Sequence, residues 1–353
     1  MAATKQISPD DIVFAAATPD QRELAWRING MSWAGSLSID DHVRRNGALA
    51  ATPHATSQTG GRTTWVMHRK DEPLDLVSSV DAVGKQALIK DASGLRTVRA
   101  YGVASVHTAP EYRKQGMAAR MLRRLQEKMD ADGEFSVLYS DIGPEYYGAL
   151  GWRAFPSLQV SAYLEGEKRA APEGIKFLSR EEAEGLCEKD VAELKERMGN
   201  LPDDGRTYVA FLPSAEQLGW QFERDAFGAK ATRGREPESY GAATADGEGW
   251  VFWHHDLSKA TLMIHRVVAK SQEAVAELLR AAVTEAGEWG LEKVVAWNPV
   301  GVVEDGARLL AEEGEGVRVR FENRSDSRLP CLRWKGGADG DVVWEDNYYY
   351  AWC

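Results

Sequence analysis

The sequence predicts a mixed α/β (α+β) protein with two domains, each built around its own sheet. The chain has 353 residues, which is more than one ordinary core needs and enough for two. A strand–helix–strand pattern covers residues 103–139, and the same order recurs over residues 262–297. Pro172-Glu173-Gly174 is typical of a boundary between them. We therefore expect domains at residues 1–172 and 173–353.

The first half begins with helices and continues mainly as strands. Capping signals at residues 18–21 and 38–41 predict two helices, which end near Gly30 and Gly47 and leave Trp33 in an apolar loop between them. Amphipathic or capped segments predict further helices over residues 110–130 and from near Pro144 to residues 151–152, the second after a turn at residues 141–145. Strand signals cover residues 63–68, 74–83, 87–90, 97–108 and 135–140.

The second half repeats a related order of strands and helices, but without the glycine motif that the first half carries at residues 113–118. Strands are expected over residues 250–255, 262–268 and 291–297, with a helix over 272–289. We therefore interpret this half as a degenerate copy of the first. Its tail, residues 348–353, is unusually aromatic.

Composition narrows the class of protein. The net charge of −11 disfavours nucleic acid and modestly favours a cationic small molecule. No apolar run approaches the ~20 residues of a membrane span, and the first residues lack the features of a signal peptide. The three widely spaced cysteines suggest neither a disulfide framework nor a metal site. We expect a cytoplasmic monomer or homodimer with no metal, membrane or nucleic-acid partner.

The strongest chemical signal is the stretch from Val106 to Ala118, where a strand runs through a turn into a helix that opens at Gly116. The first turn of a helix has unpaired amides and partial positive charge, which suit a phosphate group. Gly116 and Ala118 are small enough for a pyrophosphate to approach, and Arg113 and Lys114 add charge beside it. Taken alone, this spacing also fits an ordinary strand–turn–helix with a convenient glycine.

The stretch resembles motif A of the GNAT superfamily of N-acetyltransferases, in which Arg113, Gly116 and Ala118 match the signature (Gln/Arg)-x-x-Gly-x-(Gly/Ala). The resemblance implies a GNAT fold, whose mixed central sheet is splayed at the acetyl-CoA site. The amides of residues 113–118 would hold the pyrophosphate, and the strand end would pair with the pantetheine arm. The residues that it assigns to acetyl-CoA are Val106, His107, Thr108, Arg113, Lys114, Gln115, Gly116, Met117, Ala118 and Ser140.

A second motif follows the next strand. Residues 146–152 resemble the superfamily's Tyr-x-x-x-Gly-Phe, with Tyr147 at the tyrosine position and Trp152 in place of the phenylalanine. Ser140 lies where many members carry an asparagine, so the sequence departs from the family at that contact. Two motifs in the right order indicate the GNAT fold.

The chemistry requires a proton acceptor and a proton donor. An aliphatic ammonium has a pKa near ~10.4, so deprotonation at neutral pH accounts for roughly 4 kcal/mol of the barrier. The tetrahedral intermediate that forms by direct attack then releases CoA thiolate, which benefits from a proton. By resemblance Tyr147 supplies that proton; core packing is the alternative for this aromatic side chain.

Several residues are candidates for the base and for contact with the substrate. Asp141 follows a strand directly and ranks first, although it also fits a helix cap. Glu145 lies one helical turn away, and His107 titrates in the useful range but faces the cleft only if the strand alternation permits. Trp33, His107 and Asp141 are the candidates for contacting the amine.

The tail offers one more candidate. In some two-domain members of the superfamily, the terminal carboxylate reaches the active site and helps to accept the substrate proton. By that resemblance Cys353 is a candidate catalytic residue, with residues 348–352 as a wall of the pocket. An edge strand or an interdomain seam is the alternative for such a tail.

A closer resemblance covers roughly the first half. The runs at residues 102–113, 135–143 and 146–157 are similar to the fungal lysine N6-acetyltransferase family, which joins a GNAT domain to a family-specific C-terminal domain. Members acetylate free L-lysine with acetyl-CoA in the first step of lysine degradation. The resemblance implies the same acyltransferase here; another amine (xenobiotic, polyamine or secondary metabolite) and a non-catalytic acyl-CoA-binding protein remain alternatives.

Overall fold

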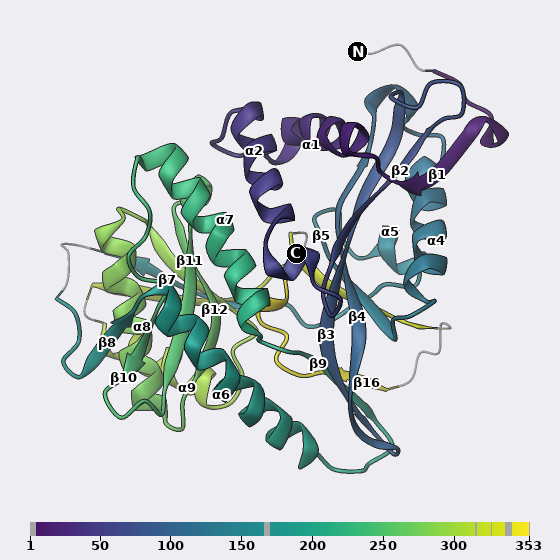
Figure 1. Cartoon of the computed structure of the whole chain (residues 1–353). Coiled ribbons are helices and arrows are strands. Elements are labelled where there is room, and N and C mark those ends of the chain that lie inside the picture. The colour runs from purple at the N-terminus through teal and green to yellow at the C-terminus, as the bar shows by residue number, and fades with distance from the viewer. Residues whose placement is uncertain (1–4, 166–169, 315, 326, 336–340, 353) are drawn as a thin grey trace.

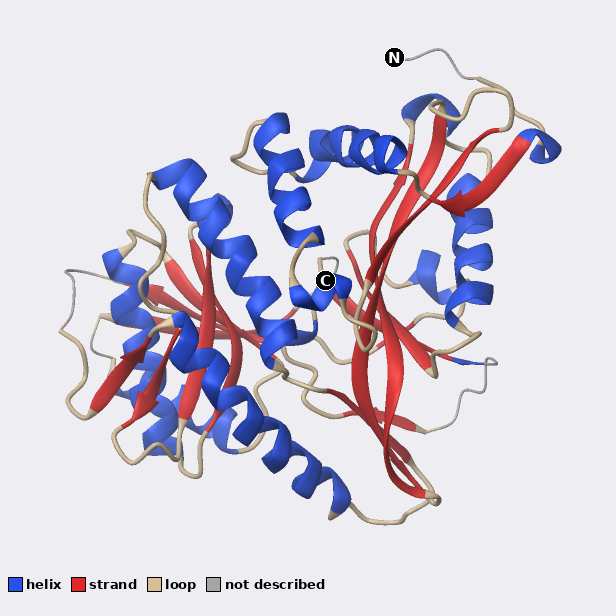
Figure 2. Ribbon diagram, viewed as in Figure 1, coloured by secondary structure: helices blue, strands red, loops and turns tan. Residues whose placement is uncertain are grey.

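The computed structural model describes residues 5–165, 170–314, 316–325, 327–335 and 341–352. Two sheets lie beside each other, with helices on their faces (Figure 2). Between the sheets, α2 (Ile39–Ala50) packs against α7 (Ala215–Arg233) (Figure 1). The predicted mixed architecture with two sheets is confirmed.

The first sheet has the strand order β1-β2-β3-β4-β5-β15-β6; in addition, β9 pairs with β3, and β16 pairs with β9. Its strands are β1 (Ile12–Ala16), β2 (Arg62–Arg69), β3 (Leu76–Asp91), β4 (Gly94–Thr108), β5 (Phe135–Ser140), β6 (Arg153–Ala154), β9 (Thr207–Phe211), β15 (Leu329–Trp334) and β16 (Val342–Trp344). The two strands expected over residues 74–83 and 87–90 form one continuous β3, because Gly84 continues the pairing with β4.

The first-half helices differ from the sequence prediction at their ends. They are α1 (Pro19–Trp33), α2, α3 (Pro53–Thr56), α4 (Met117–Met129) and α5 (Glu145–Gly148). Gly30 does not end α1, because it packs against His42 of α2, where a Cβ would lie 3.1 Å from the ring. Trp33 is therefore the last residue of α1 and does not lie in a loop. The helix α2 does not end near Gly47 as expected but continues to Ala50. The side chain of Asn46 donates back to the carbonyl of His42 within the helix.

The parallel strands β4 and β5 part soon after they meet. Their pairing consists of Tyr101 with Ser136 and Gly102 with Val137. Beyond Gly102, β4 continues to Thr108 and β5 to Ser140 without further pairing to each other. The sheet is therefore splayed where the resemblance predicted it.

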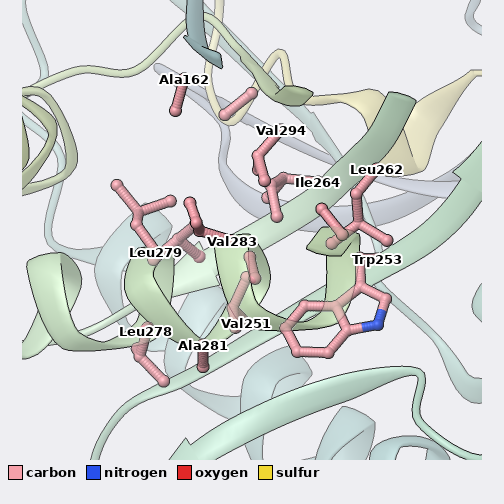
Figure 3. Packing of buried hydrophobic residues seen from close by; sticks show 14 of the residues in the cluster. Ala162, Val251, Trp253, Leu262, Ile264, Leu278, Leu279, Ala281, Val283 and Val294 are labelled. Carbon is pink, nitrogen blue, oxygen red and sulfur yellow. The ribbon is translucent and has the colours of Figure 1, made fainter. Parts of the chain in front are cut away.

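The second sheet has the order β14-β7-β13-β12-β11-β10-β8. Its strands are β7 (Leu158–Leu164), β8 (Ile175–Leu178), β10 (Gly241–Thr244), β11 (Trp250–Asp256), β12 (Thr261–Val268), β13 (Lys293–Trp297) and β14 (Val317–Asn323). Helices α6 (Arg180–Gly199), α7, α8 (Gln272–Glu288) and α9 (Val302–Glu313) accompany it. Figure 3 shows the main core, in which α8 packs on the sheet through Leu278, Leu279, Ala281 and Val283.

The second sheet repeats the parting of the first. Strands β12 and β13 are parallel and pair only from Thr261–Met263 to Lys293–Val295. Here the gap is filled, because Tyr349 packs against Met263 and Trp297, with its ring centroid 4.5 Å from that of Trp297. The turn into α8 is only residues 269–271, and Ser271 caps the helix with its side chain. The second domain is thus a GNAT-like copy without a phosphate loop.

The sheets do not divide at residue 172 as the sequence predicted. β7 lies before that point and belongs to the second sheet, while β9, β15 and β16 lie after it and belong to the first. The physical reason is hydrogen bonding across the open edges. β15 pairs antiparallel with β5, and β9 pairs antiparallel with β3. The chain therefore crosses between the sheets several times, which ties the two domains together.

None of the helices in the described ranges combines the length and the apolar composition needed to cross a bilayer.

A buried histidine joins three elements of the second domain. His255 on β11 contacts Asp225 of α7 through Nδ1 at 2.8 Å and Glu285 of α8 through Nε2 at 2.9 Å. Burial lowers the pKa of His255, but the two carboxylates outweigh this and raise it to about 9. The imidazolium is thus the folded form at neutral pH.

We expect this contact to make stability depend on pH. Because the folded-state pKa exceeds the ordinary value of about 6.5, the stabilisation is complete below pH ~6.5 and is lost as pH rises through about 9. The loss should reach about 3 kcal/mol in the free energy of unfolding, measured by urea titration at pH 6 and pH 10. The His255→Gln variant should lose this component. Equal pH profiles for the two proteins would contradict the assignment.

Candidate active site

A bulge reshapes β4 where it leaves β5. His107 pairs with Ser79 and Ala104 pairs with Asp81, so one extra residue of β4 lies between these pairs. Ser105 within the bulge has φ +54°, a left-handed conformation that is uncommon for a residue with a side chain. A bulge bends its strand and increases the local twist, which turns the end of β4 away from β5.

The turn after β4 presents a helix N-terminus to the gap. Gly116 is the N-cap of α4 with φ +74°, and no side chain caps the helix there. Lys114 is also left-handed, at φ +61°, and Arg113 Nε donates to the Thr108 carbonyl at 3.0 Å, which holds the turn against the strand end. A Cβ on Gly116 would meet nothing within 4 Å. The first amides of α4 therefore face open space, which suits a phosphate.

A cavity of about 630 Å³ occupies the gap between β4, β5 and α4. Most of the predicted site residues line it, and they come from α1, β4, the turn, α4, the end of β5 and α5. Those residues are Trp33, Val106, His107, Thr108, Arg113, Lys114, Gly116, Met117, Ala118, Asp141 and Tyr147.

Two predicted residues do not line this cavity. Gln115 directs its side chain to the N-terminal segment, where Nε2 donates to the Lys5 carbonyl at 2.8 Å. Ser140 is buried, and its hydroxyl donates to the Gly143 carbonyl at 2.6 Å. Its hydroxyl therefore holds the turn after β5, and the prediction that this side chain contacts the cofactor is not supported by its position.

Tyr147 is mostly enclosed by its neighbours. Its ring lies 5.1 Å from that of Tyr146 and 6.5 Å from that of Trp152, edge to face in both cases. Burial, followed by Tyr146 and Asp141, raises the pKa of Tyr147 to about 12. The phenol therefore keeps its proton at neutral pH and can act as a donor.

The candidates for the base differ in their surroundings. Asp141 is exposed at the end of β5 and accepts the backbone N–H of Arg328 at 3.0 Å, so it does not cap α5. His107 is buried against Trp33, with ring centroids 6.3 Å apart. Burial, and then Arg113, lower the pKa of His107, which keeps the imidazole neutral and able to accept a proton. Glu145 does not line this cavity, nor the second cavity that adjoins it.

A second cavity, of about 340 Å³, adjoins the first and lies between the two domains. Ser32, Trp33 and Asp141 line both cavities. The wall of the second cavity includes residues from α2, β3 and β4 on one side and from α7, η3 (Leu257–Lys259) and the C-terminal segment on the other. The two cavities therefore adjoin at these residues.

Charged side chains that the sequence analysis did not select surround the second cavity. They are Arg45, Arg62, Arg224, Asp256, Lys259 and Arg328. Burial raises the pKa of Asp256, but the hydrogen bond from Ser258 and the charges of Arg224 and Arg328 outweigh it and hold the pKa below the usual range. No local pattern marks these residues, because they lie on helices, strands and turns far apart in the chain and meet only when the domains pack.

The C-terminal segment is held at this cavity. Lys85 Nζ donates to the Ala351 carbonyl at 2.8 Å, and Gln221 Nε2 donates to the Trp352 carbonyl at 2.9 Å. Of the predicted wall of residues 348–352, Trp352 lines the cavity, whereas residues 348–351 do not. Cys353, the predicted catalytic terminal residue, lies outside the described residues.

Comparison with known proteins groups the chain with acetyltransferases. A family profile described as "Acetyltransferase (GNAT) domain" matches residues 63–155, and one described as "LYC1 GNAT-like C-terminal domain" matches residues 159–353. The second profile covers more than half of the chain.

Similar proteins agree with these matches. A protein named "Lysine acetyltransferase" from Yarrowia lipolytica is 22% identical over 334 residues, covering 80% of this chain and 83% of the relative. Solved GCN5-related N-acetyltransferases from Anabaena variabilis and Kribbella flavida share the fold, with TM-scores of 0.55 and 0.54 and identities of 16% and 18%. They match 92% of this chain and 73% and 72% of their own chains.

The splayed first sheet, its phosphate-type loop and the match over residues 159–353 lead to one conclusion: this chain is a GNAT acyltransferase and belongs to the family with the LYC1 GNAT-like C-terminal domain.

Proposed function

We propose that this acetyltransferase transfers acetyl from acetyl-CoA to the N6 amine of free L-lysine, in lysine degradation. The observation that carries the proposal is that two adjoining cavities share Trp33 and Asp141 in their walls. One cavity ends at a helix N-terminus, and the other is lined by guanidinium and carboxylate groups suited to an amino acid. The name of the Yarrowia lipolytica relative favours lysine among amines.

The donor fits the first cavity. GNAT enzymes use acetyl-CoA as cosubstrate, and we assign its pyrophosphate to the amides at the start of α4, with Arg113 and Lys114 beside them. The unpaired edge of β4 at residues 106–108 would pair with the pantetheine arm, because β5 has moved away. Gly116 leaves the space that this requires.

The side chains that line the first cavity include a proton donor and candidates for the proton acceptor. The substrate nitrogen attacks the thioester carbonyl carbon, and the carbon–sulfur bond breaks as the amide forms. Tyr147 donates its phenolic proton to the departing sulfur, since its raised pKa of about 12 keeps it neutral until then. Asp141, which faces both cavities, receives the proton of the ammonium; His107 is the second candidate.

We also propose that the second domain, from about residue 173, completes the amine pocket. Arg224, Asp256 and Arg328 line the second cavity from that side. The first domain alone would leave this cavity open.

The substrate assignment predicts a specific activity pattern. Free thiol should be released from acetyl-CoA with L-lysine and with N2-acetyl-lysine, and much less with N6-acetyl-lysine, because the reacting nitrogen is then blocked. Mass spectrometry of the product should place acetyl on N6. Turnover with a bulkier amine and none with L-lysine would overturn the substrate. Tight CoA binding without turnover on any amine would overturn the catalytic proposal.

The donor site predicts that Gly116→Ala weakens CoA binding at least tenfold by calorimetry. An alanine at φ +74° costs about 1–2 kcal/mol of strain, and its methyl group enters the space assigned to the pyrophosphate. The control is Gly234→Ala at the end of α7, where φ is +72° and nothing lies within 4 Å. It should suffer similar strain and keep its CoA affinity. Equal affinity in all three proteins would contradict the site.

The acid role predicts that Tyr147→Phe lowers kcat by roughly 100-fold while the Kd for CoA changes less than threefold. The ring and its packing remain, so the loss reports on the hydroxyl. Tyr163→Phe on β7, which lines neither cavity, should retain wild-type kcat. An unchanged kcat in the Tyr147 variant would leave Tyr147 with a packing role only.

A further inference from the structure

Within the described residues, two guanidinium groups that line the second cavity form no ion pair with a carboxylate. Arg45 comes from α2 and Arg224 from α7, the two helices that pack together between the sheets (Figure 1). Arg45 contacts the neutral ring of His42 at 3.0 Å, and its Nε is buried without a partner. Within the described residues, Arg224 makes no hydrogen bond or ion pair, and it stacks over Trp352 at 4.9 Å from the ring centroid.

The two other arginines of the same cavity are already paired. Arg62 donates to Asp81 at 2.7 Å and to Asn46 at 3.1 Å. Arg328 donates to Asp256 at 3.3 Å. Among the arginines that line this cavity, Arg45 and Arg224 are therefore the two that form no ion pair with a described residue, inside a protein whose net charge is −11.

The electrostatics of this group favour an incoming anion. Burial, and then Arg224 and Arg62, lower the pKa of Arg45 to about 9. Burial, and then Arg45, Arg224 and Arg62, lower the pKa of His42 to about 4. A carboxylate placed here would relieve the mutual repulsion and accept the unused N–H groups, and guanidinium groups bind carboxylates strongly.

The charged residues of the two cavities differ. Asp141 lines both cavities, whereas Arg45 and Arg224 line the second cavity and not the first. Leu49, Val83 and Trp220 supply apolar wall to the second cavity. This order suits a molecule with an amine at one end, methylene groups in the middle and a carboxylate at the other end.

We propose that Arg45 and Arg224 together bind the carboxylate of the substrate, so that the enzyme selects long-chain amino acids and rejects diamines of the same length. This inference rests on the proposed function for its choice of reaction. It adds the residues that set specificity and the direction in which the substrate lies. The reacting amine then lies near Asp141 because the carboxylate is held at the opposite end.

The test compares L-lysine with 1,5-diaminopentane, which is lysine without its carboxylate. The wild-type enzyme should prefer L-lysine by about 100-fold or more in kcat/KM, because the diamine has no carboxylate to accept charged hydrogen bonds from the two guanidinium groups. Arg224→Ala and Arg45→Gln should each remove most of this preference, mainly through the KM for L-lysine, and change kcat/KM for the diamine less than threefold. Arg224→Lys should restore part of the preference because it keeps the charge.

A matched control lies one residue away. Arg44 is on the same helix, is largely exposed and pairs with Asp41. Arg44→Gln should behave as wild type toward both amines. A wild-type enzyme that uses both amines equally, or arginine variants that lose both activities in parallel while remaining folded, would overturn the inference.

A binding measurement separates this inference from the proposed function. L-Norleucine has the carboxylate and chain of lysine but no terminal amine to acetylate. Calorimetry with the full chain should detect L-norleucine binding to wild type and to Arg44→Gln, and at least tenfold weaker binding to Arg224→Ala. That result would support the carboxylate site even if no amine tested is acetylated. Equal binding to all three proteins would overturn the site even if L-lysine is a substrate.

Discussion

The structure depends on the early parting of β4 and β5. Two parallel strands that stayed paired to their ends would close the sheet, and α4 would start against a filled surface. The bulge at Ser105 bends β4 after the pair Gly102–Val137, so the strand end keeps unpaired backbone groups and the N-terminus of α4 faces a cavity. Backbone geometry therefore creates the cavity that we propose as the donor site, and Arg113 and Tyr147 line it.

The second domain has the same parting with a different outcome. Tyr349 fills the gap between β12 and β13, and the turn into α8 is too short to form a phosphate loop. A buried ion-pair group fixes the segment that carries Tyr349, because Arg266 binds Asp190 through two bonds of 2.6 and 2.7 Å and Asp346 at 2.6 Å. The second domain therefore supports the C-terminal segment, which forms part of the wall of the cavity between the domains.

Sequence reasoning succeeded where a site depends on local backbone and failed where it depends on packing. The turn before α4 and Tyr147 could be located because a glycine N-cap and a motif tyrosine leave a continuous signal. Ser140 and Gln115 have the right positions in the motif, but their side chains bond to Gly143 and Lys5 instead.

No sequence pattern marked Arg45 and Arg224 as site residues. They are 179 positions apart in the chain (224 − 45), and neither belongs to a motif. The helices that carry these arginines could be predicted in part. The contact between α2 and α7 could not be predicted, because it depends on how strands of the second half complete the first sheet. The same exchange of strands explains why the predicted boundary at residue 172 differs from the division between the sheets.

The central claim is that the acyl donor occupies the parted strands of the first sheet and the amine occupies the seam between the domains. Hydrogen–deuterium exchange with peptide-level resolution tests it most directly. CoA alone should protect residues 103–119, and L-lysine added to the CoA complex should further protect α2 and α7. Protection by CoA at residues 261–275, or no additional protection of α2 and α7 by L-lysine, would contradict the account.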